Sequence, residues 1–149
     1  MPTKNLPGII AVESIPFTDL TLYPKRMLSP GSSTSAIGNF SKLPTVGLLS
    51  CNISTERTVS GLVYTTKING NVFECDQLTT AQRHTLQEKL HAFRLTDVYR
   101  NQYLVGEDKA PFPEINFSPA IDADSSGSRI ISFEIVWISS LPPIEIVVL

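Results

Sequence analysis

The sequence predicts a mainly β domain, a β-sandwich or partly closed barrel, with one flanking α-helix at about residues 79–92 and an extended N-terminal arm. Three observations support this fold class. About eight to ten short segments are rich in β-branched and aromatic residues and are separated by Gly, Pro, Asn and Ser. One segment has helical periodicity. Prolines recur throughout the first 44 residues, which is typical of an extended segment.

Composition restricts the classes of function. The chain has 149 residues, enough for one domain, and only 17% of them are charged, below the usual value of about 25%. Part of the surface is therefore expected to face another protein, with a sparsely charged monomer as the alternative. The net charge is −2 and the closest approach to a basic cluster is Lys25-Arg26, so nucleic acid is not an expected partner.

Cysteines and hydropathy indicate the compartment. Cys51 and Cys75 are too few for a disulfide framework and are expected to be buried free thiols. Residues 1–15 lack the continuous apolar run of a signal peptide. No apolar run approaches the roughly 20 residues of a membrane span. The expected partners therefore exclude membranes, and synthesis in a cytoplasm is expected.

The first 44 residues are predicted to be a proline-rich arm and loop that packs on the domain or on a neighbouring subunit, and residues 45–149 a single β-rich domain. Within the arm, strands are predicted at 8–13 and 17–23. The segment 29–41 has the small, polar composition of a flexible loop.

Two strands are predicted at 45–54 and 60–68. Asn69-Gly70, between β-branched and aromatic residues, is a strong type I′ turn signal, so a hairpin is predicted there with a further strand at 71–75. The helix follows. Thr79 and Gln82 form a capping-box pattern. A narrow apolar stripe, formed by Leu86, Leu90 and Phe93, is expected to lie over an open face of the sheet.

A second hairpin is predicted in "FRLTDVYRNQYLVG", residues 93–106. Asp97 is either a catalytic carboxylate or an acceptor for backbone N–H groups of the turn, and the second interpretation is favoured. Arg100 stands where a turn glycine is expected. Because Asn tolerates the left-handed region better than Arg does, the turn is expected to shift by one residue, to Asn101.

The last third of the chain is predicted to be extended. Residues 110–119 contain prolines and are expected at an edge. In residues 128–139 the apolar side chains of one face alternate as Ile131, Phe133, Ile135 and Trp137. The final strand, "IEIVVL", is either central in the sheet or donated to a neighbour. The residues proposed for assembly on this strand are Ile144, Ile146, Val148 and Leu149.

Two patterns were weighed as metal sites. His84, Glu88 and His91 lie at i, i+4 and i+7 of the predicted helix, and an ordinary exposed face is favoured over a metal site. Asp122, Asp124 and Ser126 match the first half of a calcium loop, but the closing Glu is displaced by one position, so a turn is favoured. No G-x-S-x-G or P-loop pattern occurs. No enzymatic activity, catalytic residue or cofactor is therefore expected.

The stretch "FRLTDVYRNQYLVGEDKAPFP", with the preceding "VYTTKINGNVFEC", resembles a pattern of small structural proteins in the tail and head–tail connector modules of bacteriophages and prophages. The resemblance covers about twenty residues, in the conserved order L-T-D…Y-L-V-G. It implies a non-enzymatic virion protein, made in the host bacterial cytoplasm, which assembles with copies of itself and other virion proteins into a homo-oligomeric ring or tube.

The alternative function is a β-sandwich module that binds carbohydrate or another ligand through loops such as 122–127. Such a module needs exposed aromatic side chains. Trp137 lies on an apolar strand face and is expected in the core. The remaining candidates are Tyr23, Tyr64, Tyr99 and Tyr103.

Overall fold

The computed structural model describes residues 3–5, 8–23, 33–74, 80–118 and 129–146. These residues form a sheet of twelve strands with one α-helix and one short 3-10 helix. The principal strand order is β10-β11-β7-β6-β2-β8-β9-β12-β4-β3, with β1 beside β6 and β5 beside β2. The sheet is open, because β10 and β3 stand at opposite ends of this order. The prediction of a mainly β fold with one helix is confirmed.

The elements follow one another along the chain with short connections. Their bounds are β1 (Thr3–Asn5), β2 (Ile9–Pro16), η1 (Phe17–Asp19), β3 (Thr21–Tyr23), β4 (Ser33–Ile37), β5 (Ser41–Lys42), β6 (Thr45–Thr58), β7 (Gly61–Glu74), α1 (Thr80–Glu88), β8 (His91–Asp97), β9 (Gln102–Val105), β10 (Glu114–Ser118), β11 (Arg129–Ser139) and β12 (Ile144–Ile146).

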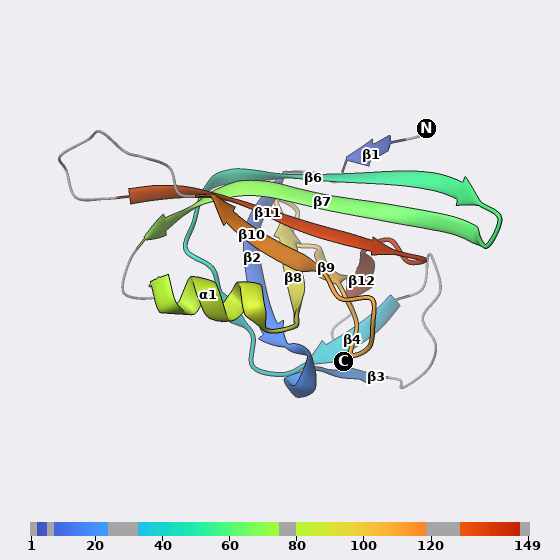
Figure 1. The fold of residues 1–149 in the computed structure, drawn as a ribbon, viewed down its shortest axis with the longest axis horizontal. Coiled ribbons are helices and arrows are strands. Elements are labelled where there is room, and N and C mark those ends of the chain that lie inside the picture. The colour runs from blue at the N-terminus through green and yellow to red at the C-terminus, as the bar shows by residue number, and fades with distance from the viewer. Residues whose placement is uncertain (1–2, 6–7, 24–32, 75–79, 119–128, 147–149) are drawn as a thin grey trace.

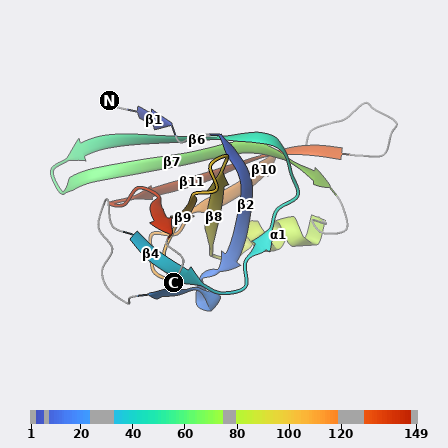
Figure 2. The same cartoon turned by 180° about the vertical axis from the view of Figure 1, so that it is seen from behind.

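The strands are arranged in two layers. In Figure 1, β6, β7, β11 and β10 run across the top of the molecule, and β2, β8 and β9 cross beneath them; Figure 2 shows the same arrangement from behind. The side chains between the layers are apolar and buried, and the largest fully buried ones include Trp137, Phe93, Ile9 and Leu95. Burial of these side chains is the main favourable contribution to folding.

The strand predicted at 128–139 is confirmed as β11. Its predicted inner face is buried, with Trp137 fully enclosed and its indole Nε1 donating to the Pro111 carbonyl oxygen at 3.0 Å. The outer face carries Ile130 and Ile138, which are 39% and 56% exposed. The edge prediction for residues 110–119 is also confirmed, because β10 ends the strand order.

The hairpin predicted at Asn69-Gly70 is wrong. Both residues lie inside β7, a single strand of 14 residues, and neither has a positive φ. The chain turns instead at Val59-Ser60, between β6 and β7. Gly70 is needed for packing rather than for turning, because a Cβ there would collide with the Leu49 side chain and lie 3.1 Å from Cε1 of Phe133.

The N-terminal region enters the sheet. β2 pairs with β8, and Arg94 makes a two-point ion pair with Glu13, at 2.7 and 3.0 Å, while stacking over the Phe40 ring. The single strand predicted at 17–23 is wrong, since Phe17–Asp19 form a 3-10 turn before β3. The loop predicted at 29–41 is wrong for residues 33–37, which form β4.

The helix is shorter than predicted. α1 ends at Glu88, and Thr79, the predicted cap, lies outside the described residues. The predicted stripe is divided among three environments: Leu86 packs against the core, Leu90 is 44% exposed, and Phe93 is fully buried in β8. The stripe is divided because the chain changes from helix to strand before its third member.

The C-terminal strand is internal. β12 pairs antiparallel with β9 and parallel with β4, and Ile144 is buried. Of the two alternatives for this strand, the structure has the central one. Ile146 is half-buried at the end of the strand, and Val148 and Leu149 lie outside the described residues.

Candidate functional site

Asp97 closes the turn between β8 and β9. Its side chain is fully buried, and its Oδ1 accepts hydrogen bonds from the backbone N–H groups of Tyr99 and Asn101, both at 2.9 Å. The Tyr103 hydroxyl donates to Oδ2 at 3.3 Å. The carboxylate thus satisfies donors of the chain reversal that have no strand partner. The turn interpretation of Asp97 is confirmed.

The expected shift of this turn to Asn101 is wrong. Arg100 itself takes the left-handed conformation, with φ of 70°. Three hydrogen bonds surround it: the two that Asp97 Oδ1 accepts, and one that the Arg100 N–H donates to the Asp97 carbonyl oxygen at 3.0 Å. These bonds fix the backbone path on both sides of Arg100, so the conformation is set by the turn and not by the preference of the residue.

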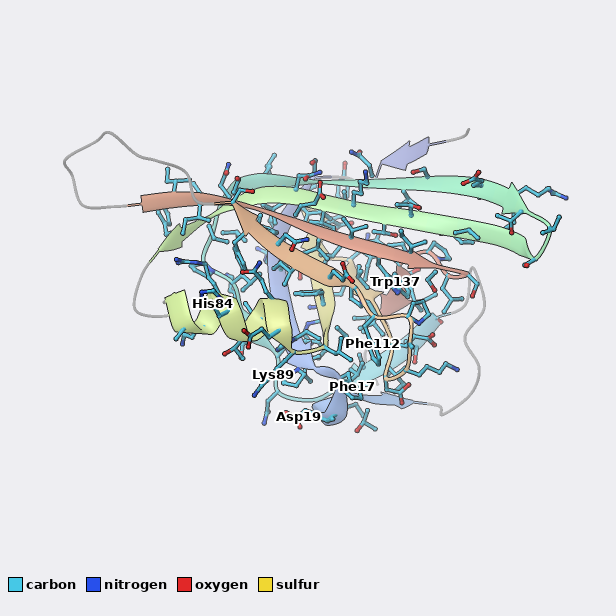
Figure 3. The ribbon with its side chains drawn as sticks, viewed as in Figure 1. Phe17, Asp19, His84, Lys89, Phe112 and Trp137 are labelled. Carbon is cyan, nitrogen blue, oxygen red and sulfur yellow. The ribbon has the colours of Figure 1, made fainter. Side chains whose placement is uncertain are left out.

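The helical His/Glu pattern does not form a site. His84 and Glu88 are exposed on α1 (Figure 3), but His91 is the first residue of β8, is buried, and has its Nδ1 at 3.0 Å from the Lys89 carbonyl oxygen. The three side chains therefore do not share a face, which corrects the premise drawn from their spacing. Within the described ranges no three His, Cys, Asp or Glu side chains gather. The calcium-loop candidates, Asp122, Asp124 and Ser126, lie outside those ranges.

The nucleophile and aromatic candidates are mostly enclosed. Cys51 is 2% exposed, and burial raises the pKa of its thiol to about 12, so the reactive thiolate is scarce at neutral pH. Burial, with Asp97 as the next cause, raises the pKa of Tyr103. Tyr64 and Tyr103 are half-buried and Tyr99 is exposed. The side chains of Tyr23 and Cys75 lie outside the description.

The hairpin of β6 and β7 extends beyond the rest of the molecule, and its end, residues 56–63, is named here the hairpin tip (Figure 1). β11 accompanies β7 only as far as Tyr64, and β1 accompanies β6 only as far as Ser54. Within the described ranges the hairpin tip therefore has two strands and no third. The turn is locally ordered, because Thr58 Oγ1 donates to the Gly61 carbonyl oxygen at 2.9 Å and accepts from the Ser60 N–H at 3.2 Å.

The hairpin tip is apolar on one side. Side chains of a strand alternate between faces, and the face that carries buried Ile53 and Thr66 in the body continues outward to Leu62. Leu62 is 43% exposed and Val59, in the turn, is fully exposed. The face that packs on the core elsewhere thus continues where the described part of the chain provides no core. Sequence reasoning missed this feature because it placed the turn at Asn69-Gly70.

No family model matches the chain, and no curated protein or solved structure matches it. As for membranes, none of the helices in the described ranges has both the length and the apolar character needed to cross one.

Proposed function

We propose that the protein is a non-enzymatic structural protein of a bacteriophage virion that assembles into a ring or tube in the tail or at the head–tail junction. The observation that carries the proposal is the projecting hairpin tip, whose apolar side has no cover among the described residues. The resemblance of residues 93–113 to phage tail and connector proteins supports the same role. The low charge, 17% of residues, also favours a surface that faces other proteins.

The energetics favour a neighbour at the hairpin tip. A two-stranded hairpin in water is marginally stable by itself. Burying Val59 and Leu62 against another subunit would contribute about 1.5–3 kcal/mol for each side chain. The tip is a different surface from the one that receives it, so the contact is head-to-tail, and such contacts generate closed rings or open tubes.

In this proposal the two layers act as the rigid body of a sandwich-like subunit, and the hairpin tip is its reaching element. The assembly role first assigned to the C-terminal strand moves to the tip, because β12 has strand partners on both edges within its own chain. Ile146, Val148 and Leu149 would then contribute only at the rim of a subunit contact.

The test is the oligomeric state of the purified chain by size-exclusion chromatography with light scattering. The wild-type protein is expected to form a ring or larger assembly, and the double variant Val59→Asp/Leu62→Asp a monomer with an unchanged circular dichroism spectrum. Ile138→Asp is the matched control, since Ile138 is similarly exposed but lies on the outer face of the body, and it should assemble as the wild type does. A wild-type monomer at high concentration, or a double variant that still assembles, would contradict the proposal.

A further inference from the structure

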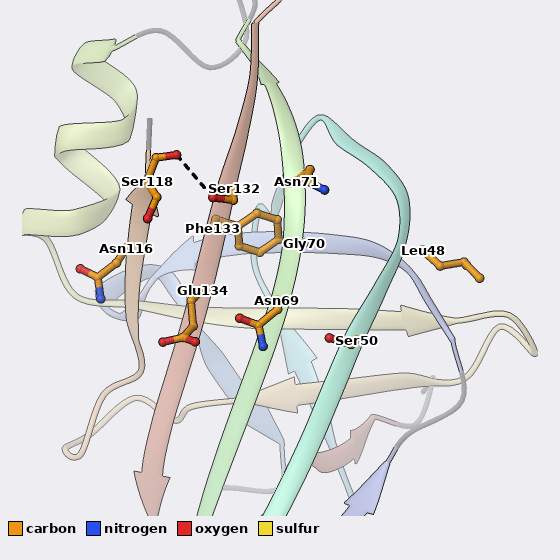
Figure 4. Close-up of a pocket in the computed structure, with 10 residues that line it drawn as sticks. All are labelled: Leu48, Ser50, Asn69, Gly70, Asn71, Asn116, Ser118, Ser132, Phe133 and Glu134. Carbon is orange, nitrogen blue, oxygen red and sulfur yellow. Dashed lines mark hydrogen bonds between the residues drawn. The ribbon is translucent and has the colours of Figure 1, made fainter. Parts of the chain in front are cut away.

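A shallow polar groove of about 580 Å³ lies on the outer face of β10, β11, β7 and β6 (Figure 4). This volume is within the range of pockets that bind small molecules, roughly 300–1,000 Å³. Short polar side chains and one carboxylate line most of it. The lining residues are Leu48, Ser50, Asn69, Gly70, Asn71, Asn116, Ser118, Ser132, Phe133 and Glu134. This set is named here the polar groove.

Strand register places the polar groups in rows. Asn69 pairs with Ser50 on one side and with Glu134 on the other, and Glu134 pairs with Asn116, so one row crosses all four strands. Because neighbouring strands are about 4.8 Å apart, the row presents hydrogen-bonding groups at regular intervals. A second row crosses three strands and comprises Asn71, Ser132 and Ser118.

The amides of the polar groove are available to a ligand. Ser132 Oγ donates to the Ser118 carbonyl oxygen at 3.5 Å, the one hydrogen bond drawn between lining residues in Figure 4. Among the described residues no side-chain hydrogen-bond partner is found for Asn69, Asn71 or Asn116. Each of these amides keeps an acceptor oxygen and two donor hydrogens for water or a ligand.

Secondary structure alone does not account for this composition. Asn, Ser and Gly are disfavoured in strand interiors, where β-branched and aromatic residues pack better. Here they occupy the centres of adjacent strands, and their short side chains create the hollow. Local preferences that disagree with the observed structure occur most often at functional sites. Gly70 is explained by Leu49, but Asn69, Asn71 and Asn116 have no such packing reason.

The chemistry of the polar groove selects a ligand class. No Lys or Arg lines it, and Glu134 repels anions, so phosphates, sulfates and acidic sugars are unsuitable. Amides and hydroxyls both donate and accept, as the hydroxyl groups of a sugar do. Leu48, 67% exposed at the rim, offers apolar contact for the C–H groups of a sugar ring. We propose that the polar groove binds a neutral saccharide.

The test is a nuclear magnetic resonance titration of the ¹⁵N-labelled full chain with neutral oligosaccharides of glucose, galactose, mannose and N-acetylglucosamine. The side-chain amide signals of Asn69, Asn71 and Asn116 should shift for at least one of them. The signal of Asn52, exposed on β6 outside the polar groove, should not shift. Asn69→Ala/Asn71→Ala should weaken binding at least about tenfold, since each lost hydrogen bond contributes about 1 kcal/mol, whereas Asn52→Ala should leave it unchanged.

Three outcomes would overturn the proposal: no shift of the groove amides with any of these sugars at millimolar concentration, unchanged affinity in the double variant, or tighter binding of sulfated than of neutral sugars. If the double variant loses its native spectrum, Asn116→Ala on a different strand provides the same comparison. Neither result bears on the assembly proposal, which is read from oligomeric state and from a surface that shares no residue with the polar groove.

Discussion

The Asp97 turn allows a quantitative prediction for Asp97→Ala. Two backbone N–H groups lose a charged acceptor at 2.9 Å, and the Tyr103 hydroxyl loses a longer contact. Hydrogen bonds to charged groups contribute about 1.5–3 kcal/mol each. Water can reach the freed N–H groups because Tyr99 and Asn101 are exposed, so the lower part of that range applies. The expected loss of unfolding free energy is about 2–4 kcal/mol.

Asp97→Asn separates the acceptor from the charge. The amide oxygen still accepts from both N–H groups, so the expected loss is only about 1 kcal/mol. Tyr103→Phe removes the longer contact alone and should cost about 0.5 kcal/mol. The ordering Ala, Asn, Phe from least to most stable is therefore the prediction.

The assay is urea unfolding followed by tryptophan fluorescence, because Trp137 is the only tryptophan and is fully buried. With a urea dependence of about 2 kcal/mol per molar, Asp97→Ala should lower the midpoint by about 1–2 M. Equal midpoints for the Ala and Asn variants would refute the reasoning, since they would show that the acceptor oxygen does not hold the turn.

Three further predictions concern stability in the same assay. Arg100→Gly should stabilise the protein by about 0.5–1 kcal/mol, because the left-handed conformation costs a non-glycine residue more than the added chain entropy of glycine; a loss of stability would contradict this. Gly70→Ala should destabilise it by about 1–3 kcal/mol through collision with Leu49, and a neutral result would mean that the strands separate freely there. Burial raises the pKa of Glu107 above its ordinary 4.5, with Lys109 opposing. Because the folded pKa is the higher one, its contribution is fully present below the unfolded pKa and is lost as pH rises through the folded pKa. Glu107→Gln should thus be more stable than the wild type at about pH 7 and equal to it at about pH 3; equal stability at both would contradict the shift.

Elements defined by their own local pattern could be predicted. The 128–139 strand was predictable because four apolar side chains alternate over a full strand length, and they are buried as expected. The hairpin around Asp97 was predictable because a short acceptor stands directly before a chain reversal. Both features need only near neighbours in sequence, and period and turn chemistry report these reliably.

Elements defined by distant partners could not be predicted. Residues 33–37 have a loop-like composition, yet they form β4 because β12 and β3 supply backbone partners on both sides. Asn69-Gly70 has the composition of a tight turn, yet β11 pairs with both residues and keeps the strand straight. In each case the hydrogen bonds of a sheet partner outweigh a weak local preference.

The same dependence on partners explains why neither proposed surface was visible in the sequence. The hairpin tip exists because the partners of β6 and β7 end at Ser54 and Tyr64 while the hairpin continues. The polar groove exists because register aligns Asn69 of β7 with Ser50 of β6 and Glu134 of β11, residues far apart along the chain. A shift of one residue in register would turn these polar side chains to the core and the apolar ones outward. Both surfaces therefore depend on the pairing of β6 and β7, and a variant that alters this register should lose assembly and saccharide binding together, whereas substitutions confined to either surface should lose only one.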